Sequence, residues 1–175
     1  MIGLCFSIFG DNSGAFWTMM SFFAIMISFI FVIMQIRISN NANMISFIDS
    51  MEAKWWSPDF KQARRNVCSS QTNHIEVDHE RLLGFFEDFG ILYQRGVVDL
   101  DLIWEKFSYY IENYSKLLSP NVQQYQAKDR TYFSNFTLLQ EKIHWLSKKK
   151  TNNIHYIISD EAFEKFKETE IRELA

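Results

Sequence analysis

The sequence predicts an all-α protein in which a single N-terminal transmembrane helix precedes a cytoplasmic bundle of about five helices. Three observations predict this class. One uncharged apolar stretch is long enough to cross a bilayer, and apolar residues elsewhere recur at helical spacing. The chain also holds only 6 Gly and 2 Pro, which argues against a turn-rich β-sandwich.

The apolar stretch runs from Ala15 to Ile36 and contains no charged residue. At about 1.5 Å rise per residue it would reach roughly 33 Å, enough for a hydrocarbon core of about 30 Å. Its Ser and Thr hydroxyls can bond to carbonyls of the same helix, so they are tolerated there. No basic residue precedes it and no small-residue cleavage site follows, which favours an uncleaved anchor over a signal peptide.

The charges are placed unevenly along the chain. All 18 Lys and Arg residues lie at or beyond Arg37, and the first 36 residues hold one acid, Asp11, and no base. By the positive-inside rule we expect a single-pass protein of the inner cell membrane with its N-terminus outside and its C-terminal part cytoplasmic. Two cysteines, Cys5 and Cys68, fit reduced thiols facing a cytosol better than a disulfide framework.

The region after the span begins with apolar residues on one helical face. The spacing i, i+4, i+7 and i+11 places four apolar residues on one helical face: Met44, Ile48, Met51 and Trp55. This pattern predicts a stalk helix that continues from the span. The expected parts are therefore a short external N-terminus (1–14), a transmembrane helix (15–36), a juxtamembrane stalk helix (37–56), a helical cytoplasmic domain (57–150), and a linker with a C-terminal helix (151–175).

Capping residues mark the helices of the cytoplasmic domain. Ser57-Pro58-Asp59 suits the start of a short helix, and Asn73 to Glu76 has the form of a capping box. The long apolar helix that follows is expected to end at Gly96, and Asp99 is expected to cap a helix from Leu100 to about Leu118. Further helix starts are predicted at Ser119-Pro120, at Thr131 and at Ser159-Asp160-Glu161. The last of these begins a polar terminal helix, which is expected to dock on the bundle through Phe163 and Phe166.

Small or polar residues form a stripe along the span. Gly14, Ser21, Ser28 and Gln35 recur every seven residues, and Ala24 lies between them. Small side chains let two helices approach closely, and hydroxyl or amide groups can bond across the gap. The stripe is our candidate seam for self-association, and a chance pattern is the alternative.

Asp88-Phe89-Gly90 matches the Asp-Phe-Gly motif of protein kinases, whose aspartate binds magnesium. The other kinase motifs, namely the glycine-rich loop, the strand lysine and the catalytic loop, are absent from the sequence. We interpret Phe89 as a packing residue and Gly90 as a point of close helix approach. Glu87 and Asp88 adjoin much apolar surface; if buried, each needs a partner such as Arg81 or Arg95. A structural ion pair is favoured over a catalytic acid.

Two other clusters have functional and structural interpretations. His74 and His79 lie among carboxylates that could hold a metal. The two histidines are five residues apart, so they would not lie on the same face of a helix, and a capped helix start is favoured. Cys68 is read as a lone buried thiol. Trp145 with Lys148, Lys149 and Lys150 could contact anionic lipid, or form a solvated helix end. We expect no metal and no cofactor.

The sequence resembles a bacterial family of small membrane-anchored proteins, the domain of unknown function numbered 4760. The resemblance covers roughly Ala15 to Trp145 and implies an N-terminal span followed by a helical cytoplasmic domain, without catalytic residues. It rests on Trp56-Ser57-Pro58-Asp59, Ala63-Arg64-Arg65, Leu82-Leu83-Gly84-Phe85-Phe86-Glu87, Gly90, Gly96-Val97-Val98-Asp99, Ile103-Trp104 and Phe107.

These features predict a membrane-anchored, non-catalytic helical interaction module that acts at the cytoplasmic face through self-association or a partner protein. A membrane-perturbing effector of a bacterial defence or toxin system is the alternative, with the candidate seam lining an assembly. An enzyme using Glu87 and Asp88, or His74 and His79, is a further alternative, so the question of enzymatic activity stays open. The formal net charge of −3 does not favour nucleic acid as a partner.

Overall fold

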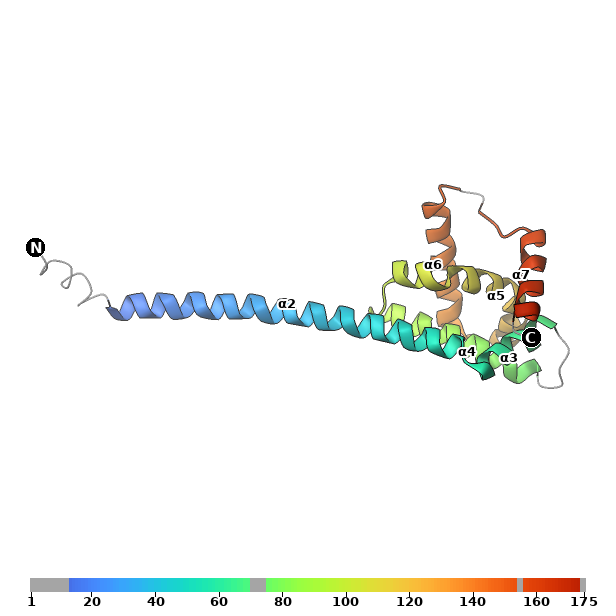
Figure 1. The fold of residues 1–175 in the computed structure, drawn as a ribbon, viewed down its shortest axis with the longest axis horizontal. Helices are drawn as coiled ribbons and strands as arrows, with labels where there is room; N and C mark the ends of the chain where they lie inside the picture. The colour runs from blue at the N-terminus through green and yellow to red at the C-terminus, as the bar shows by residue number, and fades with distance from the viewer. Residues whose placement is uncertain (1–12, 70–74, 154–155, 174–175) are drawn as a thin grey trace, which may run out of the picture. The chain divides into compact units, whose positions relative to one another are not determined.

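The computed structural model describes residues 13–69, 75–153 and 156–173, and the described part of the chain is built from α-helices, which confirms the all-α class (Figure 1). The chain divides into two compact units, Met1–Ile45 and Ser46–Ala175. The helices are α2 (Ser13–Trp55), α3 (Pro58–Ser69), α4 (Ile75–Gln94), α5 (Leu100–Lys128), α6 (Ser134–Lys150) and α7 (Asp160–Glu173).

The first unit contains residues 13–45 of α2. This helix is long and apolar enough to span a membrane. Within it, the Thr18 hydroxyl donates a hydrogen bond to the Gly14 carbonyl, and the Ser28 hydroxyl donates one to the Ala24 carbonyl, each at 2.8 Å. Both hydroxyls therefore find acceptors in their own helix, as the sequence predicted for polar groups in an apolar environment.

The core of the second unit is centred on Trp55, whose exposed fraction is 0%. Ile48 and Met51 are buried on the same face of α2, which confirms the predicted apolar face. The second unit begins at Ser46, so the C-terminal part of the expected stalk helix (37–56) belongs to it. The rings around Trp55 are those of Phe60, Phe85, Phe86, Phe107, Tyr110 and Tyr114.

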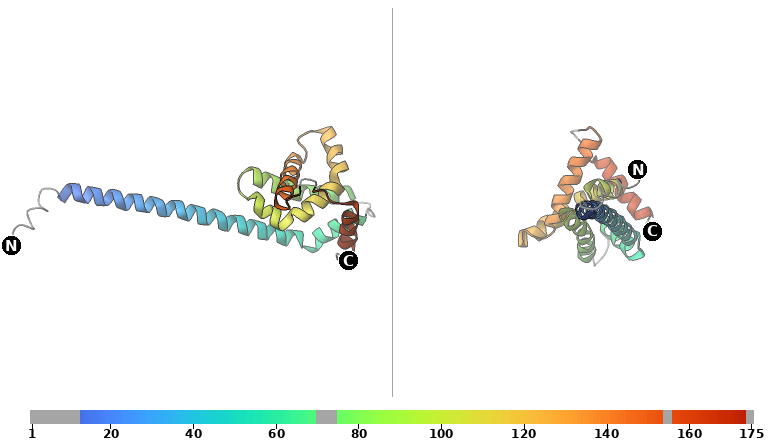
Figure 2. Two further views of the ribbon diagram at one scale, coloured as in Figure 1. Left: turned by 90° about the horizontal axis from the view of Figure 1, so that it is seen from above. Right: turned by 90° about the vertical axis from the view of Figure 1, so that its left-hand side faces the viewer.

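The helices that follow α2 lie close together in both views of Figure 2. Helix α4 packs against α3, α5 and α6; α6 also packs against α5, and α7 packs against α3. Gly90 is buried in α4, where an added Cβ would collide with the backbone carbonyl of Asn135 at the start of α6. The close helix approach predicted at Gly90 is therefore confirmed.

The turn between α4 and α5 follows the predicted capping pattern. Gly96 has a φ of +66°, and the amide of Val97 donates to the Leu92 carbonyl at 2.9 Å. This left-handed geometry is common where a helix ends at glycine. The carboxylate of Asp99 then accepts a hydrogen bond from the Asp101 amide and caps α5.

Pro120 lies inside α5, so the helix start predicted at Ser119-Pro120 is wrong. A proline removes one amide donor from the helix, here the partner of the Lys116 carbonyl. The helix nevertheless continues, because residues beyond the proline make tertiary contacts: Val122 is buried, and the Tyr125 hydroxyl donates to Glu80 at 2.9 Å. The next helix, α6, begins at Ser134, three residues after the start predicted at Thr131.

Candidate functional site

A buried ion pair joins α3 to α7. Arg64 is 1% exposed, and it donates from Nε to Oε2 of Glu170 at 2.8 Å and from Nη2 to Oε1 at 2.6 Å. Its guanidinium also lies 4.1 Å from the centre of the Trp55 ring. Burial acts to lower the pKa of Arg64, but the hydrogen bonds and negative charge of Glu170 outweigh it and raise this pKa above its ordinary value.

Two further polar groups belong to this buried cluster. The Tyr114 hydroxyl donates to Oε2 of Glu170 at 2.7 Å, and Sγ of Cys68 lies 3.8 Å from that hydroxyl. Burial raises the pKa of Tyr114 well above its ordinary value and raises the pKa of the Cys68 thiol to about 12. Cys68 is a free, buried cysteine, so the prediction of a lone buried thiol is confirmed.

Glu87 serves as a cap supplied from a neighbouring helix. Its carboxylate accepts hydrogen bonds from the amides of Asn135 (3.2 Å) and Phe136 (2.6 Å) and from the Asn135 side chain (2.5 Å). The residue at the N-cap position of α6, Phe133, supplies no side-chain acceptor of its own. A carboxylate there satisfies amides that the helix leaves unpaired and complements its positive end.

The candidate buried charges are therefore corrected by the structure. Glu87 is half-buried and its partner is a helix N-terminus, not an arginine. Arg81, Asp88 and Arg95 are exposed, because they occupy the face of α4 and the turn after it that point away from the core.

Replacing Glu87 with alanine is expected to lower the free energy of unfolding by about 1–2 kcal/mol, because it leaves the first amides of α6 without an acceptor. Urea unfolding of the full chain in detergent micelles, followed by circular dichroism, measures this loss. The neighbouring exposed variant Asp88→Ala is the matched control, with an expected change of about 0.5 kcal/mol or less. Equal losses in the two variants would show that Glu87 does not cap α6.

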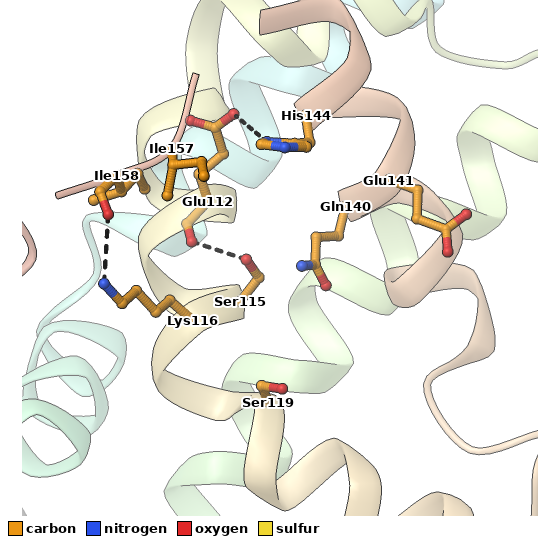
Figure 3. Close-up of a pocket in the computed structure, with 9 residues that line it drawn as sticks. All are labelled: Glu112, Ser115, Lys116, Ser119, Gln140, Glu141, His144, Ile157 and Ile158. Atoms are coloured by element: carbon orange, nitrogen blue, oxygen red, sulfur yellow. Dashed lines mark hydrogen bonds and ion pairs between the residues drawn. The ribbon is translucent and has the colours of Figure 1, made fainter. Parts of the chain in front are cut away.

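A cavity with a volume of about 440 Å³ lies between α5 and α6 and is bordered by the segment before α7 (Figure 3). Ser115 and Gln140 point toward each other across it, whereas Glu141 points away. The residues that line the cavity are Glu112, Ser115, Lys116, Ser119, Gln140, Glu141, His144, Ile157 and Ile158.

Glu112 is the buried carboxylate of this cavity, with 7% of the residue exposed. Its Oε2 accepts a hydrogen bond from the Tyr156 hydroxyl at 2.8 Å. Its Oε1 receives no hydrogen bond from the described part of the chain and lies 4.0 Å from Nδ1 of His144. Burial and the bond to Glu112 raise the pKa of Tyr156 to about 12, so the phenol remains the donor at neutral pH.

A second cavity, of about 270 Å³, is also lined by Glu112 and by the segment before α7. It contains Asn113, which is 2% exposed. The side-chain nitrogen of Asn113 donates to the Tyr109 carbonyl at 2.7 Å, but its Oδ1 has no donor among the described residues. Two buried acceptors without donors thus belong to neighbouring residues of α5.

The remaining predicted site residues are those of the candidate metal cluster and the candidate seam. His74 lies outside the described residues, and His79 is half-buried with Nδ1 2.9 Å from the Asn121 side chain. Burial lowers the pKa of His79. Over the described ranges, no group of His, Cys, Asp and Glu residues is arranged to hold a metal ion. The seam residues Gly14, Ser21, Ala24, Ser28 and Gln35 are exposed on α2, and the seam stays a prediction.

The predicted lipid-contact residues lie near the end of α6. Trp145 is exposed, and Nζ of Lys149 lies 5.3 Å from the centre of its ring. Lys150 is used within the bundle, since its Nζ is 2.7 Å from Asp101 and 4.4 Å from the Trp104 ring centre. Lys148 is half-buried, so of these lysines Lys149 is the one most available for contact with lipid.

Comparison with known proteins gives one family. Residues 22–145 match the model of the domain of unknown function DUF4760. No curated protein and no solved structure matches the chain. The matched range includes Arg64, Glu112 and His144, and it ends before Tyr156 and Glu170, which complete the two polar clusters.

Proposed function

This chain belongs to the DUF4760 family, and on that premise we propose that it is a membrane-anchored, non-catalytic interaction module. In this proposal α2 crosses the inner cell membrane, with the N-terminus outside and the bundle at the cytoplasmic face. The bundle then binds a second copy or a partner protein there.

An exposed aromatic patch carries the proposal. We define the patch as the exposed Trp56 and Tyr109 with the half-buried Tyr110 between them. The Tyr110 ring centre lies 6.4 Å from that of Trp56 and 5.5 Å from that of Tyr109. Trp56 is 45% exposed, and Lys61 lies over its ring at 5.6 Å. Trp and Tyr are the residues most often found at the energetic centres of protein interfaces, because they bury much area with little loss of side-chain entropy.

Helix α2 supports the anchoring part of the proposal. It contains the uncharged apolar segment and also supplies Ile48, Met51 and Trp55 to the core of the bundle. The basic residues begin at Arg37, on the bundle side of that segment, which favours the cytoplasmic orientation.

The non-catalytic part is supported by the contacts of the strongest catalytic candidates from the sequence. The Glu87 carboxylate is engaged by donors at the start of α6, and Asp88 is exposed. Both observations favour structural roles over acid–base chemistry, which requires a carboxylate held within reach of a substrate.

The test is amine cross-linking of the tagged full chain in native membranes, followed by isolation in mild detergent. We expect the chain in the membrane fraction, a cross-linked dimer or stoichiometric complex, and a C-terminal half protected from protease added outside the cell. Trp56→Ala with Tyr109→Ala should lower the yield of the complex about tenfold or more, as expected for interface hot spots.

The matched control is Trp145→Ala, which removes another exposed tryptophan, 56% against 45% for Trp56, from a different helix. It should leave the complex intact. A chain that stays monomeric in the membrane, or one recovered in the soluble fraction, would overturn the proposal.

A further inference from the structure

The cavity between α5 and α6 contains a buried carboxylate oxygen that lacks a hydrogen-bond donor. Oε1 of Glu112 has no donor among the described residues, although the residue is more than nine-tenths buried. A buried polar atom without a partner costs free energy, and more so when it carries charge. The nearest cationic candidate, Nδ1 of His144, is 4.0 Å from Oε1, which is beyond hydrogen-bonding distance.

The charges around this cavity favour a cation. Glu112, Glu141 and Lys116 border it, but Glu141 points away from it (Figure 3). Lys116 is already paired with Asp160 at 2.7 Å and with the Ile158 carbonyl at 3.4 Å. The basic residue of the lining is therefore occupied, while the buried carboxylate keeps one free oxygen. A ligand that brings positive charge and N–H donors complements such a wall.

The other walls limit the size and shape of the ligand. Ile157 and Ile158 supply an apolar side, and Ser115, Ser119 and Gln140 supply neutral polar groups. The volume of about 440 Å³ is in the lower part of the range of small-molecule sites. This combination suits a short alkyl chain that ends in an amine.

We propose that the cavity between α5 and α6 is a binding site for a small primary alkylammonium ion, with Glu112 as its anionic partner. The alkyl chain packs on Ile157 and Ile158, and Ser115, Ser119 and Gln140 accept the remaining N–H bonds. The site makes the bundle a receptor for a cationic metabolite, in addition to the protein association proposed above. It does not depend on the aromatic patch, so the two proposals fail separately.

The test follows the isoleucine methyl resonances of the full chain in detergent micelles by NMR, with Ile157→Val and Ile158→Val assigning the two signals. Butylammonium, 1-butanol and butyrate share a similar apolar body and differ in charge. Butylammonium should shift both signals saturably, 1-butanol should need about tenfold higher concentration or more, and butyrate should have no effect.

Two variants test the carboxylate and the cavity separately. Glu112→Gln keeps the shape of the side chain and should weaken butylammonium binding about tenfold or more, whereas the matched variant Glu141→Gln should leave it unchanged.

Ser119→Leu, at an exposed position, should fill the cavity and abolish the shifts. Its circular dichroism spectrum should stay that of the parent chain. Equal responses to butylammonium and 1-butanol, an unchanged affinity in folded Glu112→Gln, or no saturable shift would each overturn the proposal.

Discussion

Replacing Glu170 with alanine is expected to lower the free energy of unfolding by about 3–5 kcal/mol, because it leaves the guanidinium of Arg64 buried without its charge partner. Arg64 would lose both bonds to the carboxylate, at 2.6 and 2.8 Å, and the Tyr114 hydroxyl would lose its acceptor. Since α7 packs against α3, the variant should also release α7 from the bundle. Urea unfolding of the full chain in detergent micelles, followed by tryptophan fluorescence, measures the loss.

Two controls separate the buried pair from a general effect of removing a carboxylate. Glu52→Ala removes one partner of the exposed pair with Lys106, at 3.1 Å, and should cost about 1 kcal/mol or less. The double variant Arg64→Met with Glu170→Leu replaces both charges with apolar groups and should recover most of the stability. If Glu170→Ala costs no more than Glu52→Ala, the buried pair does not hold α7 in place.

The sequence contained a local sign of this pair but could not identify its partners. Arg64 lies four residues after Phe60 and four before Cys68, on the buried face of α3, and Glu170 lies four residues after Phe166. A charge on an apolar helical face indicates a buried partner of opposite sign. The two residues are separated by 106 positions, and helical spacing says nothing about which helices meet.

Local signals were sufficient where the structure depends on neighbours in sequence. We predicted the apolar face of α2 from residue spacing, the end of α4 from a glycine that can adopt a positive φ, and the cap of α5 from the Asp99 carboxylate. Each of these signals acts within one or two helical turns. The prediction failed at Pro120, where tertiary contacts of Val122 and Tyr125 hold the helix together beyond the proline. The cavity was missed for a related reason, because Glu112, His144 and Tyr156 meet only after α5, α6 and the following segment have packed.

Replacing Trp55 with alanine is expected to lower the free energy of unfolding by about 3–5 kcal/mol, at the upper end of the range for single substitutions. The ring is fully buried at the centre of the aromatic core and also stacks with the Arg64 guanidinium at 4.1 Å. Its removal leaves a large cavity and takes away part of the environment of a buried charge. The same urea unfolding experiment, followed by circular dichroism so that the lost tryptophan does not affect the signal, measures the change.

The adjacent tryptophan provides a matched control for this prediction. Trp56 is 45% exposed, so Trp56→Ala removes the same side chain from the next position without opening a cavity in the core. Its expected cost is about 1 kcal/mol or less. Trp55→Phe should fall between the two alanine variants, because it keeps an aromatic ring against Phe85 and Phe107 but fills less volume. Similar losses for Trp55→Ala and Trp56→Ala would contradict a bundle centred on Trp55, and with it the assignment of residues 46–55 of α2 to the core.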